Sequence, residues 1–231
     1  MASSTSGPAW FNKIIETVVP PVIRILPSGL VKRLTGSSKE AFLEALDEIS
    51  REGPAPEVGE PAPDILLPTL ASPEKLMGLG ELKGGWVVYF FGAYTCPVFR
   101  GGAQALSALS RKTLDDVTWL YVYPKEAHPA DGWRLKVNDD EGIVIPNHTT
   151  LAERSAAAHQ CQEKFDFAAT VLLDVMTDAA NAAYGGASPV RVFLIDPESN
   201  IAYAAGKGPG GFDVPEVQAA LKANGLLRGE V

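Results

Sequence analysis

The sequence predicts an α/β fold, in which a central mixed sheet is flanked by helices and preceded by a helical N-terminal extension. Residues 86–91 form a continuous apolar run, which is typical of a strand buried on both faces. Phe99, Ala103 and Leu106 follow at helical spacing. Residues 117–123 form a second, almost wholly apolar run. Strand and helix patterns therefore alternate, as they do when crossover helices join parallel strands.

The remaining strands and helices complete this plan. Strands are predicted at residues 171–175, 190–195 and 201–205. A short helix is predicted at residues 178–184, and a closing helix at residues 213–224. A strand–helix–strand half, followed by a hairpin and a closing helix, is the thioredoxin plan. The elements inserted between the two halves are typical of peroxiredoxin-like members of that fold.

Two capping boxes mark helix starts. Ser37 and Glu40 precede an apolar helical pattern, so we predict a helix over residues 39–51. Thr150 and Glu153 predict a second helix, which ends near residue 165. The first helix belongs to the N-terminal extension, and the second belongs to the inserted elements.

Composition predicts two parts of unequal size. Residues 1–8 are small and polar, which favours disorder, and prolines break residues 9–35 into short amphipathic pieces. Prolines and glycines crowd residues 53–63, which indicates a linker. We therefore expect an N-terminal helical extension with a Pro-rich linker at 1–57 and the main domain at 58–231.

Charge and cysteine content exclude several classes of function. The chain has 231 residues and a formal net charge of −8 without a basic block, which argues against a nucleic-acid partner. Charges and prolines interrupt the apolar stretch 14–34, so we expect no transmembrane segment. Cys96 and Cys161 are too few for a disulfide scaffold and indicate reduced thiols in a cytoplasmic protein. The scattered histidines and cysteines predict no metal site.

Cys96 lies where the first predicted strand gives way to the helix that begins near Pro97. Unpaired N–H groups and a partial positive charge at a helix N-terminus favour the thiolate, which is the reactive form. A buried structural cysteine is the alternative. A C-x-x-C dithiol is absent because Phe99 occupies the position of the second cysteine. The peroxiredoxin motif P-x-x-x-T-x-x-C fails at Tyr89 and Ala93.

Several short motifs follow one another along the chain. Residues 126–133 read Glu-Ala-His-Pro-Ala-Asp-Gly-Trp, and Thr95-Cys96-Pro97 lies at the strand–helix junction. Later motifs are Ile145-Pro-Asn-His148, Asp174-x-Met176, Asn181-Ala-Ala-Tyr184-Gly185, Arg191 and the glycine-rich segment 206–212. In this order they resemble the iodothyronine deiodinase family over about residues 58–225. Cysteine occupies the position of that family's usual selenocysteine.

The resemblance implies roles for residues around Cys96. Cys96 would be the nucleophile, and Thr95 would hydrogen-bond near its sulfur. His128 would bind substrate and exchange protons, with loop capping as the structural alternative. Tyr123 and Glu126 would belong to a proton network.

The resemblance also implies roles for more distant residues. His148 would deliver protons with help from Asp174, whose alternative is an ordinary strand-end aspartate. Arg191 would bind the substrate carboxylate near a cis-proline at Ser188-Pro189, with a surface arginine as the alternative. Cys161 is a candidate to resolve an oxidised Cys96, and a small core residue is the alternative.

The implied activity is reductive removal of iodide from an iodinated thyronine or tyrosine-like phenol. No cofactor is expected beyond an external thiol reductant, such as a dithiol or a thioredoxin-like protein. The family also implies a homodimer. Sulfur accepts iodine less well than selenium, so we expect a reduced rate. Two alternatives stay open, namely a peroxiredoxin-like thiol peroxidase and a non-enzymatic redox-sensing module.

Overall fold

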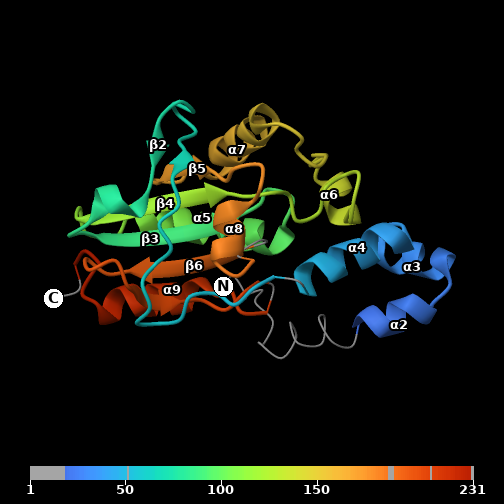
Figure 1. Cartoon of the computed structure of the whole chain (residues 1–231), viewed down its shortest axis with the longest axis horizontal. Coiled ribbons are helices and arrows are strands. Elements are labelled where there is room, and N and C mark those ends of the chain that lie inside the picture. The colour runs from blue at the N-terminus through green and yellow to red at the C-terminus, as the bar shows by residue number, and fades with distance from the viewer. Residues whose placement is uncertain (1–18, 51, 187–189, 209, 230–231) are drawn as a thin grey trace.

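A five-stranded mixed sheet forms the centre of the protein, and all five predicted strands are confirmed close to their expected bounds (Figure 1). The computed structural model describes residues 19–50, 52–186, 190–208 and 210–229. Its strand order is β5-β4-β3-β6-β7. The strands are β3 (Trp86–Gly92), β4 (Val117–Tyr123), β5 (Thr170–Leu173), β6 (Val190–Ile195) and β7 (Ile201–Ala204). β3 is parallel to β4 and antiparallel to β6, so the sheet is mixed as predicted.

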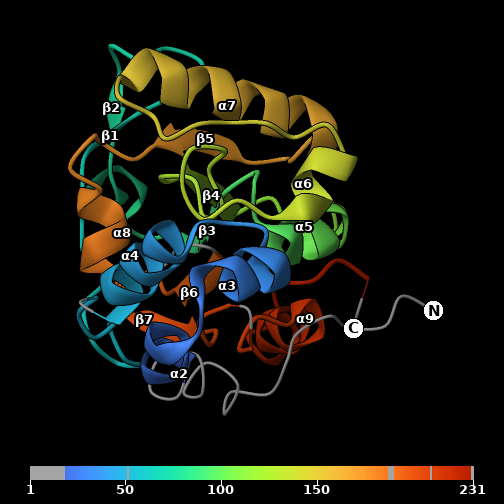
Figure 2. The same cartoon turned by 90° about the vertical axis from the view of Figure 1, so that its right-hand side faces the viewer.

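Helices pack on both faces of this sheet (Figure 2). One face carries α5 (Pro97–Ser110), α7 (Leu151–Phe165) and α9 (Val214–Ala223). The other carries α8 (Ala179–Ala183) and the short 3-10 helix η1 (Leu79–Leu82). Alternate residues of β3 enter both cores, which explains why this strand is apolar at every position. The arrangement is the predicted thioredoxin-like fold.

The N-terminal extension contains the helices α2 (Val19–Ile25), α3 (Ser28–Thr35) and α4 (Lys39–Ser50). Figure 1 shows them beside one end of the sheet. The predicted Ser37 capping box is wrong, because the Ser37 hydroxyl instead donates to the carbonyl of Arg134, 2.8 Å away. Ser38 takes over the capping role and accepts from the Ala41 amide at 3.1 Å. The expected disorder of residues 1–8 lies outside the described residues.

The short helix predicted at 178–184 is confirmed as α8, but other short elements were not predicted. The two-residue strands β1 (Leu67–Pro68) and β2 (Leu76–Met77) and the helix α6 (Lys136–Asp140) are too brief for a periodic pattern. The capping box of α7 is confirmed. The Thr150 side chain accepts from the Glu153 amide, and the Glu153 side chain accepts from the Thr150 amide. Within the parts of the chain that the structure describes, no helix is long and apolar enough to cross a membrane.

Candidate active site

Cys96 is the N-cap residue of α5 and lies four residues after Gly92, the last residue of β3. Its sulfur accepts a hydrogen bond from the Phe99 amide at 3.4 Å, and Pro97 occupies the first turn, where no N–H partner is needed. The Phe99 ring lies against Gly92, where an added Cβ would be only 2.2 Å from it. The glycine at the end of β3 therefore lets α5 approach closely and fixes the sulfur at this edge of the sheet.

The expectation that this junction favours the Cys96 thiolate is wrong in the described conformation. The residue is only 1% exposed, and burial raises the pKa of its thiol to about 11. Backbone hydrogen bonds from Phe99 and Val98 lower the pKa, but they do not offset the loss of hydration. Nearby Glu126 raises it further. The resting group is a neutral thiol, because desolvation outweighs the helix terminus.

A buried neutral thiol should be alkylated slowly. We expect Cys96 to react with iodoacetamide at pH 8 at least about 100-fold more slowly than free cysteine, because its thiolate fraction is that much smaller. Mass spectrometry of the digested protein after timed quenching would separate Cys96 from Cys161. Reaction of Cys96 at the rate of free cysteine would show that its sulfur is accessible and ionised.

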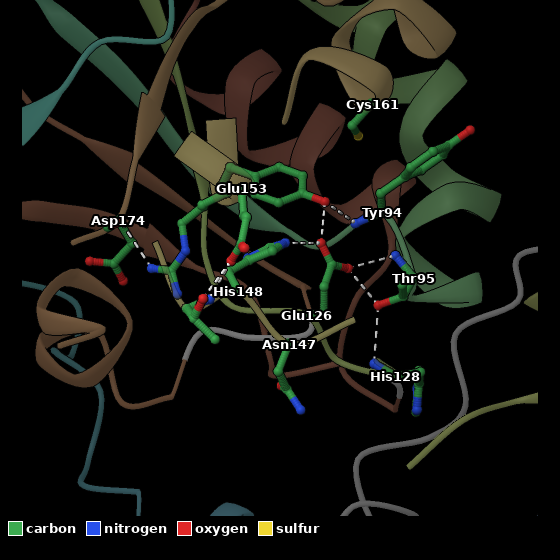
Figure 3. A network of polar contacts seen from close by, with 12 residues as sticks. Tyr94, Thr95, Glu126, His128, Asn147, His148, Glu153, Cys161 and Asp174 are labelled. Atoms are coloured by element: carbon green, nitrogen blue, oxygen red, sulfur yellow. Dashed lines mark hydrogen bonds and ion pairs between the residues drawn. The ribbon is translucent and has the colours of Figure 1, made fainter. Parts of the chain in front are cut away.

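The carboxylate of Glu126 accepts hydrogen bonds from Thr95, the residue before Cys96, and from Tyr123 at the end of β4 (Figure 3). It accepts from the Thr95 amide at 3.0 Å and from the Thr95 hydroxyl at 2.6 Å. Its other oxygen accepts from the Tyr123 hydroxyl, which in turn accepts from the Tyr94 amide at 3.3 Å. The Thr95 hydroxyl also accepts from the His128 amide at 3.0 Å. The loop after β4 is therefore tied to the residue that precedes Cys96.

His128 lies in this loop and is neutral near pH 7. Burial lowers the pKa of its imidazole to about 4, and nearby Arg100 lowers it further. The Trp133 carbonyl and Glu126 act in the opposite direction. Its Nδ1 lies 3.2 Å from the Trp133 carbonyl, and the two rings meet edge-on at 4.6 Å between centroids. A proton on Nδ1 would make this contact a hydrogen bond and leave Nε2 as the acceptor.

The low pKa of His128 makes stability depend on pH. The unfolded chain protonates this imidazole below about pH 6.5, whereas the folded protein resists protonation down to about pH 4. The folded state should therefore lose about 2–3 kcal/mol as pH falls across this window, relative to a His128→Gln variant. Urea unfolding of both proteins at pH 7 and pH 4.5 measures the difference. Equal losses in the two proteins would show that His128 protonates freely when folded.

His148 approaches the same carboxylate from another loop. Its Nε2 lies 3.4 Å from Glu126 Oε1, and both side chains are almost completely buried. The geometry does not make a hydrogen bond, and neither ring nitrogen has a hydrogen-bond partner among the described residues. The structure thus brings together Thr95, Tyr123, Glu126 and His148 beside Cys96.

Asp174 lies apart from this network. Its two carboxylate oxygens accept from the amides of Ala180 and Asn181 at 3.0 Å and 2.8 Å, so it fastens the start of α8. Burial raises the pKa of its carboxyl, and these two amides act against that shift. Buried Arg154 donates to the Asp174 carbonyl at 2.9 Å. Within the described residues, the Asp174 side chain makes no hydrogen bond to His148.

Arg191 is directed away from the thiol. It shares one face of β6 with Phe193, whereas Cys96 packs in the core on the opposite face of the sheet. Its Nε donates to the Ala205 carbonyl at 2.9 Å, and its guanidinium lies 5.2 Å from the Phe193 ring centroid. Burial lowers the pKa of the guanidinium. The expected cis-proline at Ser188-Pro189 lies outside the described residues.

Cys161 has the surroundings of a core residue. It is fully buried on α7, and its sulfur lies 3.3 Å from the Tyr121 hydroxyl. That hydroxyl donates to the Gly92 carbonyl at 2.8 Å. Burial raises the pKa of the Cys161 thiol to about 12. The resolving role stays a prediction.

Two polar residues near the thiol were missed from the sequence. Arg100, one helical turn after Cys96, donates to the Tyr94 carbonyl at 2.7 Å and to the Asn138 side chain at 2.9 Å. Asn138 donates to the Thr95 carbonyl at 2.8 Å. The spacing of Arg100 from Cys96 was a usable signal. Nothing in the sequence marked Asn138, because it lies on the short helix α6. Among the described residues, no group of three or more potential ligands could hold a metal ion.

Comparison with known proteins adds to this geometry. The family model for iodothyronine deiodinase matches residues 54–225. Human thyroxine 5-deiodinase is 34% identical over 166 residues, which cover 71% of this chain and 52% of that protein. Type II iodothyronine deiodinase from Sus scrofa is 36% identical over 140 residues, covering 60% of this chain and 51% of its own. The chain spans about half the length of these two relatives.

Solved structures show the fold. A hypothetical protein from Sinorhizobium meliloti 1021 has a TM-score of 0.53 at 18% identity, covering 78% of this chain and 91% of its own. A thiol:disulfide interchange protein from Bacteroides sp. has a TM-score of 0.50 at 15% identity, covering 76% and 93%, respectively. These likenesses confirm the predicted thioredoxin-like fold. They carry no argument about activity at such low identity.

Proposed function

The chain belongs to the iodothyronine deiodinase family, and on this premise we propose that it removes iodide reductively from an iodinated phenol, with Cys96 as the nucleophile. The relatives named thyroxine 5-deiodinase support a thyronine-like substrate. The observation that carries the proposal is the set of hydrogen bonds that joins Thr95, next to Cys96, to Glu126 and the His128 loop. A purely structural cysteine would not need this polar, buried surrounding.

The reaction needs one sulfur and one proton at the ring. The Cys96 sulfur attacks the iodine, so an S–I bond forms as the C–I bond breaks. The bonding pair stays on the ring carbon, which takes up a proton while the thiol loses its own. The products are the deiodinated phenol and a sulfenyl iodide on Cys96.

An external thiol completes the cycle. Its sulfur displaces iodide from Cys96 and leaves a mixed disulfide. A second thiol then attacks the external sulfur of that disulfide and returns Cys96 to the thiol. The two external thiols are oxidised to a disulfide, and the phenol is reduced. Cys161 is not needed in this cycle when an external dithiol is abundant.

The polar network would manage the two protons. Burial holds the pKa of the Cys96 thiol at about 11 and that of the His128 imidazole at about 4, so His128 would accept the thiol proton only after substrate changes the surroundings of both groups. The His128 Nε2 is the free acceptor when Nδ1 donates to the Trp133 carbonyl. His148 lies at ion-pair distance from Glu126, and this pair could return a proton to the ring carbon. Thr95 and Tyr123 would hold the Glu126 carboxylate between these two histidines.

Substrate has to change the surroundings of Cys96. The residue is 1% exposed, so an iodine atom can reach the sulfur only after neighbouring side chains move. Arg191 would bind the substrate carboxylate only after its guanidinium leaves the Phe193 ring, and it would do so from the face of the sheet opposite to Cys96. We therefore propose that side chains around Cys96 move when substrate binds.

Iodide release tests the proposal. Reduced protein is incubated with an iodothyronine and, separately, with an iodotyrosine, each with excess dithiol, and iodide is measured against a protein-free control. Release that exceeds the control supports the function. A parallel measurement of peroxide consumption separates it from the peroxidase alternative. Absence of iodide release from both substrates, with Cys96 shown to be reduced, would contradict the proposal.

A further inference from the structure

The N-terminal helices contact the His128 loop at several points. The Phe42 ring on α4 meets the Trp133 ring edge-on, with 4.8 Å between centroids. Glu48 on the same helix forms an ion pair with Lys125. Ser37, just before α4, donates to the Arg134 carbonyl. Contacts of three different kinds thus join this extension to both ends of one loop.

Trp133 lies between Phe42 and His128. Its ring meets the Phe42 ring edge-on, and it also meets the His128 ring edge-on, with 4.6 Å between the Trp133 and His128 centroids. The indole N–H is buried and has no acceptor among the described residues, so packing rather than hydrogen bonding holds the indole. Trp133 also packs against the small core formed by Ile23, Val31, Phe42 and Leu46. The imidazole therefore packs against a residue that the N-terminal helices also contact.

We propose that α4 is a positioning element for the site: Phe42, acting through Trp133, fixes the orientation of the His128 ring and keeps the indole over one side of it. The proposal deepens the proposed function, because His128 is the group expected to accept the thiol proton. Phe42 itself touches neither the thiol nor the imidazole in any contact of the described residues. It is a positioning residue and not a catalytic one.

The electrostatic surroundings of His128 agree with this role. Burial is the largest cause of its low pKa, and the charged groups that act on the ring are Arg100 and Glu126. Neither of them belongs to the N-terminal helices, so removing the Phe42 ring would leave both in place. It would admit water beside Trp133 and remove part of the desolvation. The imidazole should then become more basic.

NMR titration of the imidazoles tests this inference without any activity assay. The chain contains only three histidines, so His148→Gln and His159→Gln variants assign the signals. We expect Phe42→Ala to raise the pKa of His128 by about one unit or more. Phe42→Tyr, which keeps the ring, should restore a pKa close to that of the wild type. Val31→Ala, which removes a buried side chain of the same small core but leaves the Phe42–Trp133 ring contact, should move it much less.

Each outcome decides the inference. A folded Phe42→Ala protein with an unchanged His128 titration would overturn it, and so would an equal shift in Val31→Ala. Should Phe42→Ala fail to fold, Phe42→Leu takes its place, since this change keeps an apolar side chain on α4 but removes the ring contact with Trp133. A rise in the His128 pKa in Phe42→Leu then supports the inference, and no rise overturns it. Because iodide is not measured, failure of the proposed function would not alter these results.

Discussion

Replacing Cys96 with serine should lower the rate of iodide release by about 1,000-fold or more. A hydroxyl oxygen is a poor acceptor of iodine and ionises far less readily than a thiol. The fold should survive, because serine is a favourable N-cap residue and its oxygen can accept from the Phe99 amide in place of sulfur. Initial rates of iodide release at saturating substrate, with equal amounts of folded protein, measure the effect.

Cys161→Ser is the matched control for this experiment. Its hydroxyl can keep the contact with Tyr121, so the same chemical change is made at a second buried thiol. With excess dithiol, this variant should keep its rate within a few-fold of the wild type. A Cys96→Ser protein that releases iodide as fast as Cys161→Ser would remove Cys96 from the reaction. If only Cys161→Ser lost most of its rate of iodide release, Cys161 would instead be the thiol that accepts iodine.

Replacing Glu126 with alanine should destabilise the protein by about 3–5 kcal/mol. The change removes the acceptor of the Thr95 amide, the Thr95 hydroxyl and the Tyr123 hydroxyl, all of which lie in the buried interior. Unpaired buried donors lose the hydration that they would have in the unfolded chain. Urea unfolding at pH 7 measures the difference. The variant should also alkylate faster at Cys96, since the neighbouring Thr95 is no longer held.

Two further variants separate the network from a general loss of charge. Glu126→Gln keeps one acceptor oxygen and should be destabilised by about 1–2 kcal/mol. Glu48→Gln removes a more exposed carboxylate, which pairs with Lys125, and should change stability by less than about 1 kcal/mol. If Glu126→Ala were no less stable than Glu48→Gln, the buried network would contribute nothing to the fold.

The sequence predicted the parts of the fold that local physics decides. The apolar run at residues 86–91 could be recognised because β3 is buried on both faces, and the Thr150–Glu153 capping box because both partners lie within one turn. The Ser37 capping box was wrong because a residue far along the chain, Arg134, captures the Ser37 hydroxyl. Local patterns cannot report such tertiary competitors.

For the candidate site, the sequence indicated which residues lie near one another, but not the environment that surrounds them. Glu126, Thr95, Tyr123 and His148 do meet beside Cys96. The protonation of the thiol was not predictable, because its pKa depends on how completely other segments bury it. The direction of the Arg191 side chain depends on the register of β6 against β3, which sequence pattern does not determine.

The account rests on Cys96 accepting iodine directly, and a single-turnover experiment tests this most directly. Reduced protein, freed of external thiol, is mixed with excess iodinated phenol, and the deiodinated product is counted per protein molecule. We predict about one product per Cys96 and then no more, with turnover resuming when dithiol is added. The Cys96→Ser variant should form none. Product formation by that variant, or no product from wild-type protein whose Cys96 is shown to be reduced, would contradict the account.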